Sequence, residues 1–167
     1  EESRYYKRFF ARMYQEDLQA IWKAIAEKAG GDWLDIGSGD GSLLADVVKM
    51  TNHNFSLTCL EPSLHAIPDL KKNVPVQKVI TEPLSKETEL DDSYDLITMM
   101  HSNYYFPPSQ YEEILSKLLS ALNKGGKLLI LTISEKGDFP KLGDYPYDSK
   151  LLAENTYAIL KKLGKNT

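Results

Sequence analysis

The chain has 167 residues, of which 42% are hydrophobic and 26% are charged, and its formal net charge is −4. This is the composition of a globular protein with one substantial core, and the acidic balance argues against binding nucleic acid through a basic face. No apolar run approaches the ~20 residues that span a bilayer, and no signal-peptide pattern is present. The single cysteine, Cys59, cannot form an internal disulfide, so we expect a cytoplasmic protein.

The spacing of apolar residues predicts helices and strands that alternate along the chain. A first helix is expected over residues 4–28, ended by Gly30 and Gly31. Short apolar runs then predict strands over 33–36, 55–60, 76–80, 94–100 and 127–133. Between and after them, helices are expected over 42–50, 63–73, 109–124 and 149–163.

Three local features refine these helices. Pro68 is expected to interrupt the helix over 63–73. Ser109 and Glu112 form the pattern of a capping box, and Glu113 with Lys117 forms a favourable i, i+4 pair. The pair of glycines at 125–126 is expected to close the helix over 109–124.

Uniformly apolar strands that alternate with helices predict an α/β fold. We expect a doubly wound, mainly parallel, Rossmann-like sheet of about five strands with helices on both faces. The chain is predicted to be a single domain over 1–167, with an N-terminal helical lid over 1–30 and a core over 31–167. In such folds ligands bind beyond the carboxyl ends of the strands.

A glycine-rich loop follows the first strand of this core. Its glycines, Gly37, Gly39 and Gly41, permit positive φ and let a ligand approach the backbone before the next helix begins. The dinucleotide fingerprint requires Gly-x-Gly-x-x-Gly, whereas here the pattern is Gly-x-Gly-x-Gly. Asp40, inside the loop, disfavours a pyrophosphate, and a loop flanked by Asp35 and Asp40 suits a zwitterionic ligand that carries a sulfonium charge.

Glu61 ends the second strand, 20 residues after Gly41. A carboxylate at this place in the fold can accept both hydroxyls of a ribose. The alternative is a solvated acid at a strand end, and the order of strand, loop, helix, strand and acid favours the ribose.

These segments resemble the motifs of class I S-adenosylmethionine-dependent methyltransferases. The likeness rests on Leu34–Gly41, Glu61–Ser63, Tyr94–Ile97 and Leu122–Leu128, which occur in the family's order. It implies a methyltransferase whose cofactor is S-adenosyl-L-methionine. By this resemblance the cofactor-binding residues are Asp35, Gly37, Ser38, Gly39, Asp40, Gly41, Glu61, Pro62, Ser63, Thr81, Glu82, Met100 and His101.

The stretch from Tyr94 to Gly143 resembles histamine N-methyltransferase and its small-molecule relatives, which implies a small acceptor such as an amine. The substrate-binding residues that this resemblance and the aromatic pattern suggest are Tyr5, Gln15, Glu16, Tyr104 and Tyr105. The pattern Asn-Pro-Pro-Tyr, which is typical of enzymes that methylate amides or nucleobase amino groups, is absent. We therefore expect neither a nucleic acid nor a membrane as partner.

His101 is the candidate catalytic residue, because an unperturbed histidine titrates near neutrality. It could orient the acceptor or take its proton, or be a polar residue packed at a strand end. Tyr104, Tyr105 and Phe106 form either an aromatic wall beside a cation or ordinary packing aromatics. No pattern of metal ligands is present, so we expect no metal.

Class I methyltransferases usually add two further strands after the last helix predicted here. Their absence from this sequence predicts an open apolar edge at the fifth strand. Either the core is truncated at its C-terminus, or another chain covers this edge, for example in a homo-oligomer. The alternative to an enzyme is a non-catalytic module that binds S-adenosylmethionine or S-adenosylhomocysteine, or a core that needs a partner. A nicotinamide-dependent oxidoreductase is disfavoured by the glycine spacing.

Overall fold

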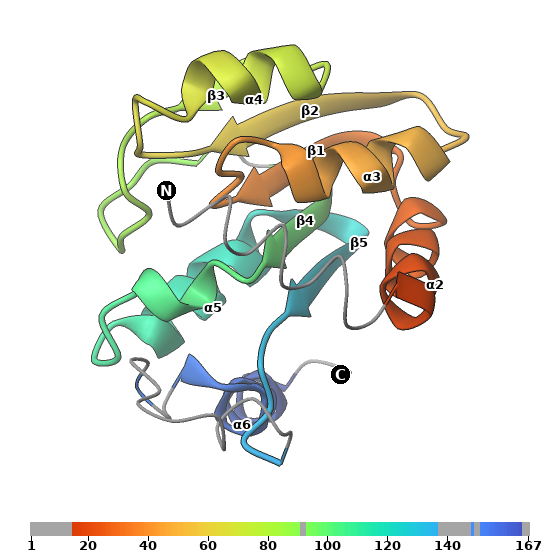
Figure 1. Ribbon diagram of the computed structural model, residues 1–167. Coiled ribbons are helices and arrows are strands. Elements are labelled where there is room, and N and C mark those ends of the chain that lie inside the picture. The colour runs from red at the N-terminus through yellow and green to blue at the C-terminus, as the bar shows by residue number, and fades with distance from the viewer. Residues whose placement is uncertain (1–14, 91–92, 137–147, 149–150, 165–167) are drawn as a thin grey trace.

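The computed structural model describes residues 15–90, 93–136, 148 and 151–164, with the side chains of 15–17 excepted. One five-stranded sheet organises these residues, in the order β3-β2-β1-β4-β5, and every neighbouring pair is parallel (Figure 1). The strands are β1 Gly31–Ile36, β2 Phe55–Leu60, β3 Lys78–Ile80, β4 Tyr94–Met100 and β5 Leu122–Leu131. The predicted doubly wound parallel sheet is therefore confirmed.

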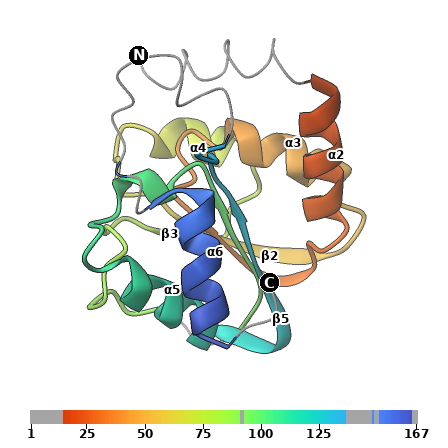
Figure 2. The same ribbon diagram turned by 90° about the horizontal axis from the view of Figure 1, so that it is seen from below.

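Helices cover both faces of the sheet, as Figures 1 and 2 show from two directions. The helices are α2 Gln15–Ala26, α3 Ser42–Met50, α4 Ile67–Asn73, α5 Tyr111–Ser120 and α6 Ala153–Lys162, with a 3-10 turn, η1, at Asn103–Tyr105. Trp33 packs into a core with α2, α3 and Leu70 of α4, whereas its neighbour Leu34 packs into a second core with α5. Successive side chains of the strand thus point to opposite faces of the sheet and pack in different helix layers, as the two-residue period of a strand requires.

The strand order places the reversal of the winding between β1 and β4. The chain proceeds outward from β1 through β2 to β3, then returns to the other side of β1 for β4 and β5. The carboxyl ends of β1 and β4 are therefore neighbours, and the loops that follow them diverge to opposite layers. This edge holds the glycine loop and the segment that begins at His101.

The prediction for the glycines at 125–126 is wrong. They do not close a helix, because α5 ends at Ser120 and both glycines lie inside β5. Tyr94 pairs with Leu122, whereas Leu96 pairs with Lys127, so β5 carries extra residues at an irregularity in the ladder. A glycine at a strand irregularity is a common alternative to a glycine at a helix end.

The predicted capping box and ion pair of α5 are also wrong. Gln110 precedes the helix, and no side chain caps it. The ammonium of Lys117 donates to the backbone carbonyl of Thr88, and Glu113 lies 3.9 Å from Lys86 instead. Contacts with the loop after β3 outweigh the pattern within the helix.

The remaining differences concern element ends. Pro68 does not interrupt a helix, because α4 begins at Ile67 and the proline occupies its first turn, where its missing N–H is not needed. Strand β1 begins two residues earlier than predicted, and β3 is two residues shorter. Of the helix predicted over 4–28, residues 4–14 lie outside the described residues. Helix α6 begins four residues later than predicted.

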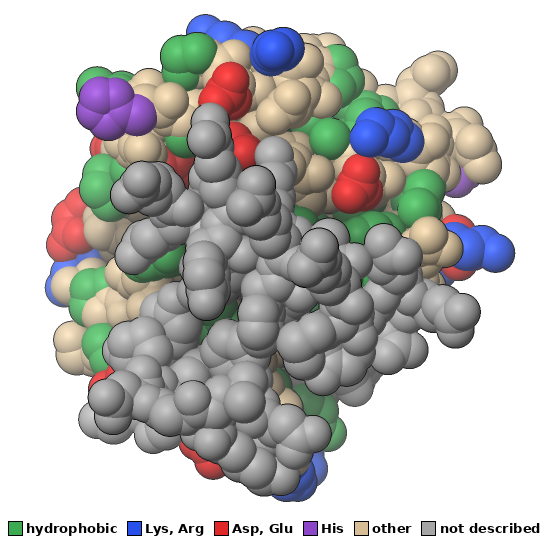
Figure 3. Space-filling view, viewed as in Figure 1, with side chains coloured by type: hydrophobic (Ala, Val, Ile, Leu, Met, Phe, Trp, Pro, Cys, Tyr) green, Lys and Arg blue, Asp and Glu red, His purple; other side chains and the backbone are tan. Residues whose placement is uncertain are grey.

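None of the described helices is both long and apolar enough to cross a membrane. On the face shown in Figure 3, the acidic and basic side chains of the described residues lie interspersed, without a patch of one charge. Whether the outer edge of β5 pairs with another chain stays a prediction.

Candidate functional site

The glycine loop, residues 37–41, is held by contacts on three sides. The Gly37 N–H donates to the Leu60 carbonyl at 2.8 Å. A Cβ on Gly37 would overlap Ser102, which follows β4, and a Cβ on Gly41 would lie 2.8 Å from Cδ1 of Leu70 on α4. Close packing against the protein therefore accounts for glycine at these two positions.

Gly39 differs from its two neighbours. Its φ of +55° favours glycine, yet a Cβ built there would meet no atom of the described residues within 4 Å. Packing within the described residues therefore does not explain the missing side chain. Open space above a backbone in the left-handed region is what a closely approaching ligand requires.

Glu61 fastens the loop from the end of β2. It is buried, and its Oε2 accepts the Gly39 N–H at 2.7 Å while its Oε1 accepts the Ser63 N–H at 2.7 Å. Each carboxylate oxygen has a further lone pair. The acid thus fixes Gly39 and keeps acceptor capacity for a ligand hydroxyl.

Asp40 precedes α3 by two residues. Its Oδ1 accepts the N–H of Ser42, the first residue of that helix, at 3.0 Å. In dinucleotide-binding folds this helix end receives the pyrophosphate. A carboxylate at this position opposes a second anion, which agrees with the glycine spacing in disfavouring a dinucleotide.

Asp35 lies on β1 beneath the loop and is 1% exposed. Burial raises the pKa of its carboxyl to about 6, an effect opposed by hydrogen bonds from Thr98 and Ser38 and reinforced by the nearby charge of Glu61. Thr98 Oγ1 lies 2.5 Å from Asp35 Oδ1. A buried acid that titrates near neutrality, at a strand end, is typical of a functional site.

His101 follows β4 with a left-handed backbone, at φ of 54°. Its Nδ1 lies 3.1 Å from the hydroxyl of Tyr104, and that hydroxyl accepts the N–H of Ile133 at 2.7 Å. Burial lowers the pKa of the imidazole to about 4, so the ring is neutral at pH 7. A strained backbone at a non-glycine residue is a further mark of a functional position.

The other predicted site residues differ in burial, and some lie outside the described residues. Pro62, Ser63, Thr81 and Glu82 are exposed at the ends of β2 and β3, and Ser38 is half-buried in the loop. Met100 packs in the core with α2 and α3. Tyr5 lies outside the described residues, as do the side chains of Gln15 and Glu16.

The three aromatic residues after β4 do not form one wall. Tyr104 is buried with Ile133, whereas Tyr105 is 69% exposed. The ring of Phe106 stacks on Tyr111 of α5, with 6.1 Å between centroids. Ordinary packing therefore accounts for Phe106. The hydroxyl of Tyr104 makes hydrogen bonds with His101 and with the N–H of Ile133.

Sequence reasoning missed three residues beside Asp35 and Gly37. Thr98 and Trp33 form a hydrogen-bonded chain with Asp35, and Ser102 Oγ donates to the Ile36 carbonyl at 2.5 Å. The available signal was the polar Thr98 among the apolar residues 96–100 of β4.

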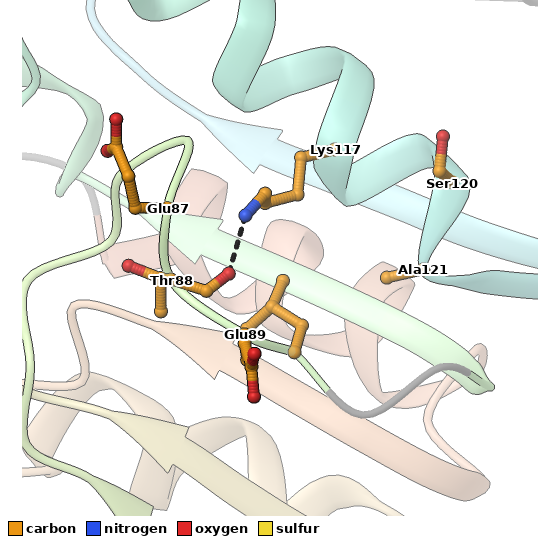
Figure 4. Close-up of a pocket in the computed structure, with 7 residues that line it drawn as sticks. Glu87, Thr88, Glu89, Lys117, Ser120 and Ala121 are labelled. Carbon is orange, nitrogen blue, oxygen red and sulfur yellow. Dashed lines mark hydrogen bonds between the residues drawn. The ribbon is translucent and has the colours of Figure 1, made fainter.

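Two surface hollows lie away from this site. One is lined by residues 87–90 and by the end of α5, where Figure 4 shows Lys117 directed at the backbone of Thr88. The other lies at the amino ends of β1, β2 and β3, and neither hollow contains a predicted site residue. Within the described part of the chain, no group of three or more acidic, histidine or cysteine side chains could hold a metal ion.

Solved structures with this fold are numerous. A methyltransferase from Bacillus halodurans is 17% identical with a TM-score of 0.63, and the alignment covers 87% of this chain and 68% of that one. A SAM-dependent methyltransferase from Leishmania major is 21% identical, with a TM-score of 0.60 and coverage of 71% and 50%. The sugar N-methyltransferase KedS8 from Streptoalloteichus is 17% identical, with a TM-score of 0.56 and coverage of 77% and 54%.

The present chain therefore spans about half the length of the Leishmania and Streptoalloteichus proteins. No curated protein sequence matches it significantly. A family model described as a methyltransferase domain matches residues 6–160, which is most of the chain and includes the glycine loop, Glu61 and His101. With this match and the parallel sheet order β3-β2-β1-β4-β5, the chain belongs to the methyltransferase domain family and has the fold of its class I members.

Proposed function

We propose that this chain binds S-adenosylmethionine over the loop 37–41 and transfers its methyl group to a small-molecule acceptor. Gly39 carries the proposal, because its missing side chain leaves space that the described residues do not fill. The Leishmania major protein, a SAM-dependent methyltransferase, and the sugar N-methyltransferase KedS8 support the cofactor and the class of acceptor. The likeness to histamine N-methyltransferase stays a prediction.

The residues around the loop have the chemistry that this cofactor requires. S-adenosylmethionine carries a sulfonium and an ammonium. Asp35 supplies a carboxyl group just before the loop, and Asp40 supplies one within it. Glu61 holds the loop and has lone pairs for two ribose hydroxyls. Thr81 and Glu82, exposed after β3, would lie toward the adenine.

The bound cofactor supplies a methyl group already activated by the positive sulfur. The task of the protein is then to align the acceptor atom with that methyl group and to exclude water. A pKa of about 4 makes His101 a poor match for proton transfer at neutral pH. We therefore assign His101 a positioning role, in which the Tyr104 hydroxyl fixes the orientation of its ring.

An amine is one acceptor class that this site would suit. The described groups closest to the loop are acidic, and they would stabilise an ammonium or sulfonium rather than an anionic acceptor. A neutral amine needs alignment more than a dedicated base, which agrees with a weakly basic His101.

Methyl transfer from labelled S-adenosylmethionine to panels of amines, thiols, carboxylates and hydroxyls tests the proposal. We expect transfer to at least one small acceptor, and stronger binding of S-adenosylhomocysteine than of NAD. Binding of S-adenosylhomocysteine without transfer to any acceptor would favour a module that binds the cofactor without catalysis. Tight NAD binding without S-adenosylhomocysteine binding would contradict the proposal as a whole.

A further inference from the structure

A buried chain of hydrogen bonds runs from Trp33 to Asp35 by way of Thr98. Asp35 and Thr98 are register partners on β1 and β4, and their side chains lie on the same face of the sheet. The Trp33 Nε1–H donates to Thr98 Oγ1 at 2.8 Å, and Thr98 Oγ1 lies 2.5 Å from Asp35 Oδ1. All three residues are at most 1% exposed.

The chemistry of the three groups gives this chain a single direction. An indole N–H is a donor only, so Thr98 must accept from Trp33. A hydroxyl has one proton, and the oxygen of Asp35 is the neighbour that can accept it. Thr98 therefore donates to Asp35, and Trp33 prevents the hydroxyl from turning away.

The surroundings of Asp35 otherwise disfavour its charge. On the β2 side, Cys59 is its register partner and Glu61 contributes a like charge. Ser38, in the glycine loop, lies close enough to lower the pKa of the carboxyl, and its hydroxyl donates to the backbone carbonyl of Asp35 at 3.3 Å. Among the described groups that act on the carboxyl, burial and Glu61 raise its pKa, whereas Thr98 and Ser38 lower it.

We propose that Thr98, oriented by Trp33, is a positioning residue that keeps the Asp35 carboxylate ionised and aimed at the cationic methionine portion of the cofactor. The inference rests on the proposed cofactor site, because Asp35 must face that ligand. The ammonium of S-adenosylhomocysteine keeps its charge over the range in which Asp35 titrates. Affinity for this ligand should therefore decline as the pH falls and Asp35 takes up a proton.

The test measures two quantities against pH. The first is the carboxyl ¹³C shift of Asp35 in the protein without ligand, and the second is the dissociation constant of S-adenosylhomocysteine. We expect one midpoint near pH 6 in both curves. In Thr98→Val both midpoints should rise by about one pH unit, since a hydrogen bond to a charged group is lost. Affinity should return to the original value well above the new midpoint.

Two further variants separate positioning from packing. Thr98→Ser keeps the hydroxyl and should keep both midpoints near pH 6. Trp33→Phe removes the indole donor together with part of a fully buried ring, so it should lower stability at every pH and raise both midpoints by less than Thr98→Val does. A purely structural role would weaken affinity equally at every pH and move no midpoint. If Thr98→Val does not fold, the comparison of Trp33→Phe with the unmodified protein decides between the two roles.

The two proposals fail in different ways. If the ligand still binds but the midpoints are unchanged in Thr98→Val and Trp33→Phe, the proposed role of Thr98 and Trp33 is overturned. Absence of S-adenosylhomocysteine binding at every pH would refute the cofactor site, and the ¹³C titration would still report whether Thr98 acts on Asp35.

Discussion

Asp35→Asn is predicted to stabilise the protein while weakening its ligand site. Asp35 is buried on β1, the strand between β2 and β4, and burial raises the pKa of its carboxyl from 3.8 to about 6. Above pH 6 the folded protein must therefore hold a charge that the unfolded chain carries more easily. An asparagine has nearly the same shape, accepts the Thr98 proton through its carbonyl, and is neutral at every pH.

The magnitude follows from the difference between the two pKa values. Because the folded-state pKa is raised, the folded protein binds more protons than the unfolded chain between about pH 4 and pH 6. Its stability therefore falls as the pH rises through this window and is constant above it. A difference of about two pH units, at about 1.4 kcal/mol each, corresponds to about 3 kcal/mol at pH 7.5 as an upper limit for the gain in Asp35→Asn.

Urea unfolding at pH 7.5 and at pH 4.5 measures this difference. The gain in Asp35→Asn should be largest at pH 7.5 and shrink at pH 4.5, where the folded-state carboxyl is already protonated. Asp32→Asn is the matched control, because Asp32 lies on the same strand but is exposed, and its gain should be near zero. A variant that is less stable than the original protein at pH 7.5, or whose gain does not depend on pH, would refute the reasoning.

Further predictions concern Glu61, which holds the glycine loop, and Tyr104, whose hydroxyl contacts His101. Glu61→Gln loses one of the two carboxylate acceptors, so S-adenosylhomocysteine should bind about tenfold to a hundredfold more weakly in a calorimetric titration. Unchanged affinity would show that Glu61 does not contact the ligand. Tyr104→Phe leaves the buried N–H of Ile133 without its acceptor and should lower the free energy of unfolding by about 1–3 kcal/mol. Tyr157→Phe, at an exposed tyrosine of α6, should change it by far less, and equal losses in the two variants would contradict this account.

Much of the sheet could be predicted from sequence, because its signals are local. The strands at 55–60 and 94–100 and the helix at 42–50 have the predicted limits. They consist of apolar runs or a 3.6-residue pattern that begins just after an asparagine, a serine or a glycine, and packing reinforces each pattern instead of opposing it. The doubly wound parallel arrangement could be predicted from the alternation of strands with helices and the handedness of their connections, whereas the strand order comes from the structure.

The errors arose where a distant contact decided the outcome. The glycines at 125–126 are a valid helix-end signal, but pairing of Leu122 with Tyr94 draws this segment into β5. The pattern Ser109 to Glu112 is a valid capping box, yet the helix begins two residues after Ser109. Local propensity is a weak prior wherever tertiary contacts compete with it.

The site divides in the same way. The loop 37–41 and Glu61 could be predicted, because glycine spacing and an acid at a strand end are visible in one sequence. The chain of hydrogen bonds from Trp33 through Thr98 to Asp35 could not be predicted, because it depends on the register in which β1 and β4 pair. The lowered pKa of His101 likewise depends on burial that no local pattern encodes.

Binding of S-adenosylhomocysteine to Gly39→Ala and Gly125→Ala tests the central claim most directly. Both glycines have positive φ, and a Cβ at either meets no atom of the described residues within 4 Å, so each variant carries backbone strain of about 1–2 kcal/mol. They differ in that Gly39 lies in the proposed cofactor loop and Gly125 lies in β5. The account predicts that Gly39→Ala loses most of its affinity in a calorimetric titration while Gly125→Ala keeps it. Equal affinities in the two variants would contradict a cofactor bound over residues 37–41.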